Sequence, residues 1–197
     1  MVQPADNPTD EGGPRDSSGI EVAGSSHVPD LRAIFEEHVD HVAHSLRRLG
    51  VREADVPDLT QEVFVVMHHI LPDYDPTRPM WPWIFGVLYR TAAAYRRTAF
   101  RELLDDGSLA ADRADSSVNI EETVRKGEDR KLVLLALESL ELHRRAVFVM
   151  ADIDDVPVPE IARALGIPLN TAYSRLRLAR EDFRAAASRL LRQRGDR

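Results

Sequence analysis

The apolar residues of this chain recur at helical spacing, and no segment shows the alternation of a β-strand. One stretch, PEIARALGIPLNTAYSRLRLAR from Pro159 to Arg180, contains two such patterns separated by Gly166. Glycine adopts a left-handed conformation at the lowest cost, and it commonly ends a helix. Pro168 then suits the first turn of the next helix. The stretch predicts two helices joined by a tight turn, and the whole chain predicts an all-α fold.

The second helix of this pair has two chemically different faces. At 100° per residue, Ala172, Leu176 and Ala179 share the face predicted to be buried. The opposite face presents an amide, a hydroxyl, an aromatic ring and a guanidinium, which are groups that contact bases and phosphates in a DNA groove. These residues, the recognition strip, are Asn170, Tyr173, Ser174 and Arg177, with Thr171, Arg175 and Arg180 on the flanks. The pattern is typical of a helix-turn-helix with a DNA recognition helix.

Positive charge is concentrated in two segments of a chain whose net charge is −7. Residues 83–101 contain four arginines and no acid, and residues 160–197 contain nine arginines and four acids. Two separated basic segments suggest two contacts with one polyanion. An arginine-rich helix can also be an ordinary solvated surface, but the glycine turn and the polar strip together favour DNA binding.

Three further helices are predicted in the N-terminal half. The first begins after Asp30, a candidate N-cap, and ends at Gly50, the second runs from about Pro57 to Leu71, and the third from about Met80 to Arg101. Their apolar positions predict the buried faces. These are Leu31, Ile34, Phe35, Val39, Val42, Leu46 and Leu49 in the first helix, Leu59, Val63, Val66, Met67 and Ile70 in the second, and Trp83, Phe85 and Val87 in the third.

These patterns predict two small helical domains, residues 30–101 and 131–194, joined by a flexible linker. The linker, residues 102–130, is acidic and weakly periodic. Residues 1–29 are rich in proline, glycine, serine and acids, which predicts a disordered acidic tail. No apolar run suits a membrane span or a signal peptide, so we expect a cytoplasmic protein without membrane insertion.

The sequence gives no sign of catalysis or of a cofactor. It contains no cysteine, no glycine-rich phosphate loop and no nucleophile motif, so we expect neither an enzyme nor a bound cofactor. His38, His41 and His44 recur every three residues, but the first and last diverge by about 120° around a helix, and no metal site is expected. Asp152, Asp154 and Asp155 suggest only an acidic turn.

Two longer stretches carry a family resemblance. ALESLELHRRAVFVMADIDDVPVPEIARALGIPLNTAYSRLRLARE resembles region 4 of bacterial sigma factors, and DLTQEVFVVMHHILPDYDP with WPWIFGVLYRTAAAYRR resembles region 2. No stretch resembles region 1.1, and none between the two matching stretches resembles region 3. In this the chain resembles the extracytoplasmic-function subfamily of the sigma-70 family. This resemblance implies a protein that binds core RNA polymerase, recognises −10 and −35 promoter elements and assists promoter melting.

The resemblance also implies a role for each matching segment. The helix from Leu169 to Arg180 would read the −35 element in the major groove through the recognition strip and its flanks. The loop 71–79 and the basic third helix would read and open the −10 element through Asp73, Tyr74, Arg78, Trp81, Tyr89, Arg90, Ala94, Arg96 and Arg97. The second helix would dock on the clamp helices of the largest polymerase subunits through Asp58, Leu59, Gln61, Glu62 and Phe64. Region 4 would contact the polymerase flap.

Some positions depart from the usual pattern of the family. Tyr89 and Arg90 stand where an Arg-Asn pair is common, Ala94 stands where an aspartate is common, and Tyr173 replaces a lysine. We therefore expect unusual −10 and −35 preferences.

The chain shows no sensor domain and ends soon after the recognition helix, so we expect control by an anti-sigma factor. The alternatives are a free-standing regulator and a helical adaptor, which copurification with core polymerase would distinguish from a sigma factor.

Overall fold

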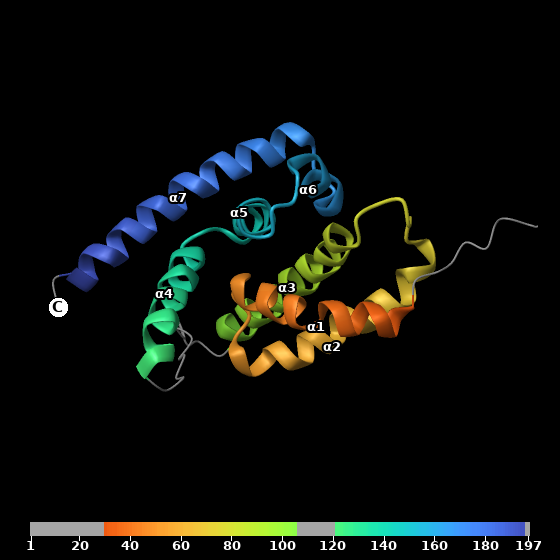
Figure 1. Cartoon of the computed structure of the whole chain (residues 1–197), viewed down its shortest axis with the longest axis horizontal. Coiled ribbons are helices and arrows are strands. Elements are labelled where there is room, and N and C mark those ends of the chain that lie inside the picture. Colours follow the sequence, from red (N-terminus) through yellow and green to blue (C-terminus); the bar gives the residue numbers. More distant parts are fainter. Residues whose placement is uncertain (1–29, 106–120, 196–197) are drawn as a thin grey trace, which may run out of the picture.

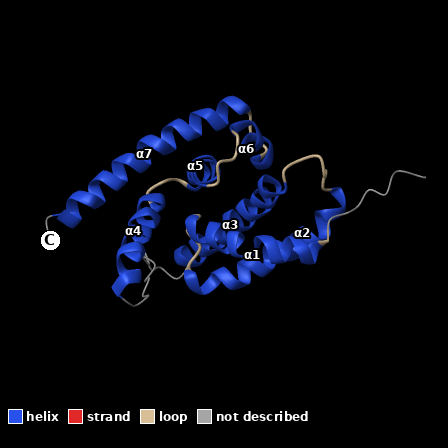
Figure 2. Cartoon of the chain, viewed as in Figure 1, coloured by secondary structure: helices blue, strands red, loops and turns tan. Residues whose placement is uncertain are grey.

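The computed structural model describes residues 30–105 and 121–195, and every regular element within these ranges is helical (Figures 1 and 2). The N-terminal half contains α1 (Leu31–Arg48), α2 (Val56–Ile70) and α3 (Met80–Asp105), with 3₁₀ turns at Glu53–Asp55 and Leu71–Asp73. The C-terminal half contains α4 (Glu121–Glu138), α5 (Leu142–Phe148), a π-helical turn η3 (Val149–Ile153), α6 (Val158–Leu165) and α7 (Leu169–Gly195). The predicted all-α fold is confirmed.

The ends of α1 follow from the residues that flank it. Asp30 Oδ1 accepts a hydrogen bond from the Arg32 backbone N–H at 3.0 Å, which caps the first turn. Gly50 has φ 87°, so the chain leaves the helix through a left-handed residue. Pro57 lies in the first turn of α2, where its missing N–H costs nothing. The predicted boundaries of α1 and α2 agree with these ends to within one residue.

The N-terminal core lies where the apolar stripes of α1, α2 and α3 meet. Its buried side chains include Val42, Leu46, Leu49, Val56, Val63, Met67, Ile84, Phe85 and Leu88. Burial of a side chain of this size stabilises the fold by about 1.5–3 kcal/mol. The predictions for Phe35 and Val66 were wrong, because these side chains are 43% and 37% exposed. α2 is covered on one side only, and Phe35 packs against the edge of the Phe64 ring at a groove between α1 and α2 that is open to solvent.

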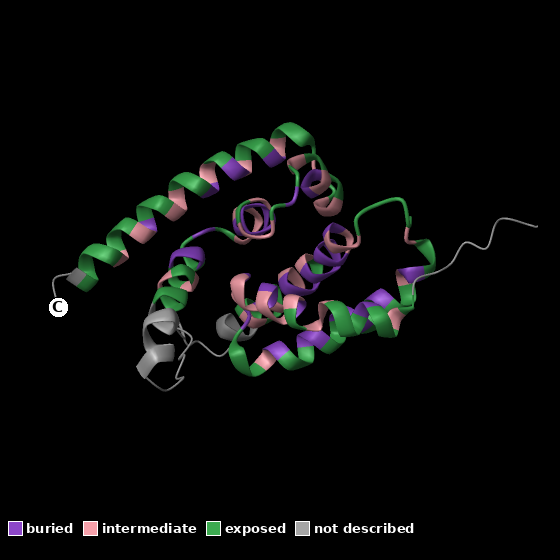
Figure 3. Cartoon of the chain, viewed as in Figure 1, coloured by how far each residue is buried: buried purple, intermediate pink, exposed green. Residues whose placement is uncertain are grey.

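The C-terminal core lies beneath α7, which passes over α5 and returns alongside α4 (Figure 1). Ala172, Leu176 and Ala179 of α7 are buried against it, and the Phe183 ring stacks on Phe148 with centroids 4.7 Å apart. Figure 3 shows the result along α7, where buried and exposed positions alternate by turn and the outer surface is exposed. The predicted inward face of this helix is confirmed.

The two halves pack against each other. α6 lies beside the N-terminal end of α3, and buried residues of both halves form one continuous cluster (Figure 1). Sequence patterns predicted each half but not this contact. The predicted linker, residues 102–130, is helical at both ends, because α3 continues to Asp105 and α4 begins at Glu121. Its middle, residues 106–120, and the predicted tail, residues 1–29, lie outside the described residues.

Candidate nucleic-acid interface

The recognition strip lies on the outer face of α7. Asn170, Tyr173, Ser174 and Arg177 are all exposed, and the Tyr173 side chain is 52% exposed. Ala172 and Leu176, on the opposite face, hold the helix against the core. The helical phase predicted from the sequence is confirmed, and the strip is free to enter a groove.

A glycine turn fixes the angle between α6 and α7. Gly166 has φ 64° and ψ 38°, and its N–H donates to Arg163 O at 3.1 Å. The N–H of Ile167 donates to Ala162 O at 2.9 Å, which completes the capping pattern of a helix that ends on a left-handed residue. Pro168 precedes the first residue of α7 and accepts from the Ala172 N–H at 3.1 Å. These bonds orient the recognition helix, so its exposed strip is a defined surface.

The arginines of α7 differ in how firmly they are held. Arg180 donates to both carboxylate oxygens of Asp152, with contacts from 2.6 to 3.2 Å, and this hydrogen bonding raises the pKa of Arg180. Arg177 contacts Glu181 at 2.7 Å in an exposed pair one turn away. Exposed pairs of this kind contribute about 0–1 kcal/mol. Arg177 therefore exchanges its partner readily, whereas the fork of Arg180 is held to the domain.

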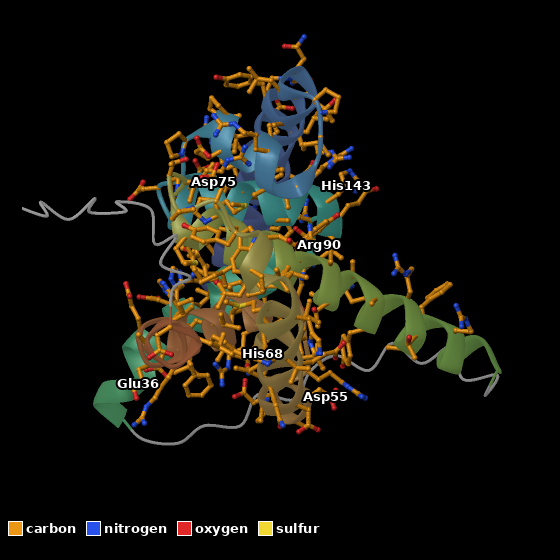
Figure 4. The ribbon with its side chains drawn as sticks, turned by 90° about the vertical axis from the view of Figure 1, so that its right-hand side faces the viewer. Glu36, Asp55, His68, Asp75, Arg90 and His143 are labelled. Carbon is orange, nitrogen blue, oxygen red and sulfur yellow. The ribbon has the colours of Figure 1, made fainter. Side chains whose placement is uncertain are left out.

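The basic half of α3 contains both exposed and engaged side chains. Arg90 and Arg97 are exposed, and Figure 4 shows Arg90 on α3. Arg96 is half-buried and donates to Leu49 O at 3.3 Å. Tyr89 and Ala94 are half-buried. Of the cations predicted to contact the −10 element, Arg90 and Arg97 are therefore the accessible ones on α3.

The loop before α3 is held by local contacts. Asp75 accepts from the backbone N–H and hydroxyl of Thr77 at 3.0 and 2.7 Å, and it pairs with Arg78 at 3.2 Å. Tyr74 is half-buried beside Trp83, with ring centroids 5.0 Å apart, and burial raises the pKa of its phenol. Asp73 is exposed. The loop is thus a preorganised turn with one free acid.

Trp81, the first aromatic residue of α3, is not free. Its ring stacks on His41 with centroids 3.5 Å apart, and its indole N–H donates to Asp154 of the C-terminal half at 3.1 Å. The sequence predicted Trp81 as a contact to the −10 element. The structure places it at the boundary between the two halves.

The predicted polymerase-docking residues divide between surface and core. Asp58, Gln61 and Glu62 are exposed on α2. Leu59 and Phe64 are mostly buried, so Leu59 supports this surface from beneath and Phe64 contributes only the edge of its ring to the neighbouring groove. Figure 4 shows His68 on the same helix and Glu36 on α1, on the side away from α2. The surface predicted to dock on polymerase is therefore polar, with an apolar groove beside it lined by Phe35, Val39, Phe64 and Val65.

Both halves match known protein families. Residues 34–102 match Sigma-70 region 2, and residues 130–183 match Sigma-70, region 4. The RNA polymerase sigma factor CnrH of Cupriavidus metallidurans is 30% identical over 83% of this chain and 89% of CnrH. The ECF RNA polymerase sigma factor SigE of Mycolicibacterium smegmatis is 28% identical over 93% of this chain and 69% of SigE. The chain belongs to the extracytoplasmic-function group of the sigma-70 family.

Solved structures share the fold of this sigma factor. CnrH in complex with the cytosolic domain of CnrY aligns with a TM-score of 0.56 and 26% identity, over 79% of this chain and 85% of CnrH. RpoE in complex with the anti-sigma factor NepR, from Bartonella quintana, aligns with a TM-score of 0.63 and 19% identity over 79% of this chain and 97% of RpoE. As a sigma factor, the protein directs promoter-specific transcription initiation by RNA polymerase.

Sequence analysis missed two acids of this sigma factor that organise its basic surfaces. Asp152 holds Arg180 of the recognition helix, and Asp154 contacts region 2. The sequence showed the cluster of aspartates, but spacing along the chain gives no sign of partners that are remote in sequence.

Among the residues that the structure describes, no helix is both long and apolar enough to cross a membrane.

Proposed function

We propose that this sigma factor contacts two promoter elements, the −35 element through α7 and the −10 element through the loop 71–79 and α3. The observation that supports this most directly is the recognition strip, which stands free on the outer face of α7 above a buried alanine and leucine. A helix of this kind fits the major groove, and its amide, hydroxyl and guanidinium groups match the donors and acceptors of base edges.

Within the strip, Arg177 is the proposed base contact. Its partner Glu181 lies on the same exposed surface, so the guanidinium can turn to a guanine at little cost. The Ser174 hydroxyl donates to the backbone carbonyl oxygen of Asn170 at 2.9 Å in the free protein. This bond does not use the side-chain amide of Asn170, which is available for a base. Arg175 and Arg180 lie at the flanks, where a phosphate is within reach. Contacts of this second kind position the helix and carry no sequence information.

In region 2, Arg90 and Arg97 are the proposed contacts to the backbone of the opened −10 strand. Both are exposed on the same helix, and single-stranded DNA is bound by tracks of cations with aromatic rings beside them. Tyr89 precedes Arg90 and is half-buried, so part of its ring remains accessible for a base. Asp73 and Arg78 of the preceding loop complete the proposed −10 surface, together with Tyr74, Ala94, Arg96 and Trp81.

Core RNA polymerase is the proposed partner of α2. Asp58, Gln61 and Glu62 present polar groups without a structural task in region 2, as expected of residues that serve an interface. We place the clamp helices of the largest subunits on this face and the flap on region 4. The protein would act in the cytoplasm, where polymerase works, without catalysis of its own.

An anti-sigma factor is the proposed regulator. CnrH, whose structure was solved with the cytosolic domain of CnrY, aligns with most of this chain at 26% identity. This likeness supports a similar protein partner here. A free-standing regulator remains the alternative class, and such a protein would act only with another sigma factor present.

Transcription with purified core polymerase tests this proposal. Added to core enzyme and a library of promoter variants, the native chain should produce a defined start site without any other sigma factor. Arg177→Ala should relax base preference at one or two −35 positions, each by about 1–3 kcal/mol, because a base contact is lost. Arg189→Ala, which removes an exposed charge further along α7, is the matched control and should keep the native preference. Failure to initiate, or identical profiles for both variants, would contradict the proposal.

A further inference from the structure

The carboxylate of Asp154, in region 4, is almost fully buried by donors from region 2. Its side chain is 2% exposed. Oδ1 lies 3.2 Å from His41 Nε2 and accepts from Arg48 Nη1 at 3.2 Å, and Oδ2 accepts from the Trp81 indole N–H at 3.1 Å. The stacked rings of His41 and Trp81 tie α1 to α3, so these donors keep a fixed arrangement. They form a preorganised anion site on region 2.

The backbone around Asp154 is unusual. The π-helical turn η3 ends directly before Asp154, and the backbone N–H of Asp154 donates to Val149 O at 3.0 Å. Asp155 follows with φ 52°, and no other non-glycine residue in the described ranges has a positive φ. π-helical turns and left-handed non-glycine residues cost free energy and concentrate at functional sites. The segment therefore holds Asp154 in a position that a regular helix would not give it.

The chemistry of the three donors matches a phosphodiester. A carboxylate and a backbone phosphate each present two oxygens that share one negative charge, and arginine and indole N–H groups bind both. The donors surround the N-terminal end of α3, directly after the loop proposed to contact the −10 element. We propose that His41, Arg48 and Trp81 form a phosphate site for the −10 DNA backbone, and that Asp154 occupies this site while the two regions are closed. The choice of DNA as the ligand rests on the proposed −10 role of region 2.

The closed arrangement cannot serve both promoter elements together. α6 packs on α3, and the recognition helix begins at Leu169, only a few residues after α6 ends at Leu165. The −10 and −35 elements lie about 25 base pairs apart, or about 80 Å along B-form DNA. The two regions must therefore separate on the promoter, and that separation withdraws Asp154 from the phosphate site.

Other contacts at the boundary oppose closure. The guanidinium groups of Arg145 and Arg96 meet at Gly50, where an added Cβ would lie 2.5 Å and 3.1 Å from their respective Nη1 atoms. Burial and the nearby charge of Arg96 lower the pKa of Arg145 to about 10. Two cations in one desolvated place repel each other. The attraction of Asp154 for its donors offsets this repulsion, so the boundary is poised to open when that contact is lost.

Two variants of different chemistry test whether the boundary opens. Asp154→Ala removes the anion. Gly86→Ala leaves the anion in place but puts a Cβ 2.6 Å from Ala164 O of α6, which is a backbone atom that cannot turn aside. Asp182→Ala is the control, since Asp182 pairs with Arg144 inside region 4 at 2.8 Å.

Opening is measured by energy transfer between dyes on Ala54→Cys and Ser188→Cys, which are specific because the chain has no cysteine. The first two variants should change the transfer efficiency in the same direction, and the control should match the native chain. Circular dichroism confirms that each variant is folded. If Asp154→Ala leaves the transfer efficiency at the native value, Asp154 does not hold the regions together and the proposal is wrong, whatever Gly86→Ala does.

DNA binding tests the site itself. Anisotropy with single-stranded DNA of mixed sequence, without polymerase, should show tighter binding by both open variants, because the competent form is more populated. Adding Arg48→Ala to either should weaken binding and lower the salt-dependence slope by about 0.7, the value for one phosphate contact. An unchanged slope would overturn the proposal.

Arg97→Ala in the open variants separates failure of the phosphate site from failure of the proposed −10 role of region 2. If Arg97→Ala weakens binding and Arg48→Ala does not, α3 contacts DNA as proposed and the phosphate site alone is wrong. If neither substitution matters, the −10 role of region 2 fails as well. If the open variants gain affinity for core polymerase but none for DNA, the occupant of the site is a protein, which also overturns the proposal.

Discussion

The two helices proposed to contact DNA, α3 and α7, differ in how many of their polar side chains are accessible. α7 presents its whole recognition strip to solvent, and the strip lies over a core that belongs to region 4. α3 lies between α1, α2 and α6, so Trp81 and Arg96 are engaged by other parts of the protein while Arg90 and Arg97 are free. The strip of α7 depends on its own domain, whereas the surface of α3 depends on how the two regions sit together.

The largest expected effect comes from Arg145, which lies between the two regions. Arg145 is 1% exposed, and its guanidinium donates to Glu138 O at 2.8 Å and Leu140 O at 3.0 Å, at the end of α4. Arg145→Ala leaves a cavity and an unpaired buried carbonyl, which should lower the free energy of unfolding by about 2–4 kcal/mol. Denaturant unfolding followed by circular dichroism measures this loss.

The neighbouring Arg144 supplies the control. It pairs with Asp182 within region 4, and Arg144→Ala should cost at most about 1 kcal/mol because the pair is partly exposed. The protein's two tryptophans, Trp81 and Trp83, both lie in region 2, and Trp81 also contacts Asp154 of region 4, so their fluorescence reports on region 2 and on its boundary with region 4. If Arg145→Ala leaves the tryptophan transition unchanged, the boundary does not couple the two regions and the comparison drawn above fails.

Two left-handed glycines sharpen the same comparison. Gly50→Ala should cost roughly 2–3 kcal/mol, because φ is 87° and the new Cβ would meet Arg145 Nη1 across the boundary at 2.5 Å. Gly166→Ala should cost about 1 kcal/mol, since nothing lies within 4 Å of the new Cβ and only backbone strain remains. Thermal unfolding ranks the two. Equal losses would mean that strain dominates at both positions and that the boundary contributes nothing at Gly50.

A smaller effect than those of Arg145→Ala and Gly50→Ala is expected at Tyr95, which anchors the middle of α3. The Tyr95 hydroxyl donates to Asp55 Oδ2 at 2.6 Å and accepts from Arg52 Nε at 2.9 Å, and the burial of the ring raises its pKa. Figure 4 shows Asp55 at the edge of region 2. Tyr95→Phe should lower the free energy of unfolding by about 1 kcal/mol.

Tyr173→Phe is the matched control, since its ring is exposed on α7 and no hydrogen bond to its hydroxyl is needed for the fold. It should leave the unfolding midpoint unchanged. A loss at Tyr173 as large as at Tyr95 would show that the recognition strip is coupled to the fold, contrary to the comparison between the helices.

Much of the local structure followed from the sequence because it depends on neighbours along the chain. The cap at Asp30, the left-handed turns at Gly50 and Gly166 and the phase of α7 all rest on bonds or spacings within a few residues. Phe35 and Val66 were misplaced because periodicity shows which residues share a helical face, but not whether another element covers it. The predicted linker was too long, since weak periodicity does not exclude helix.

The sequence by itself determined an all-helical chain with two basic segments and a helix-turn-helix, because helical period, capping and charge are properties of short stretches. Tertiary structure alone decided that Asp154 meets His41, Arg48 and Trp81, which lie between 73 and 113 residues away along the chain. A contact of that range depends on how two separately formed cores pack, and no local pattern specifies it. The packing of the two regions therefore determines which side chains of α3 are accessible, whereas the exposed face of α7 could be predicted from the helical periodicity of its sequence.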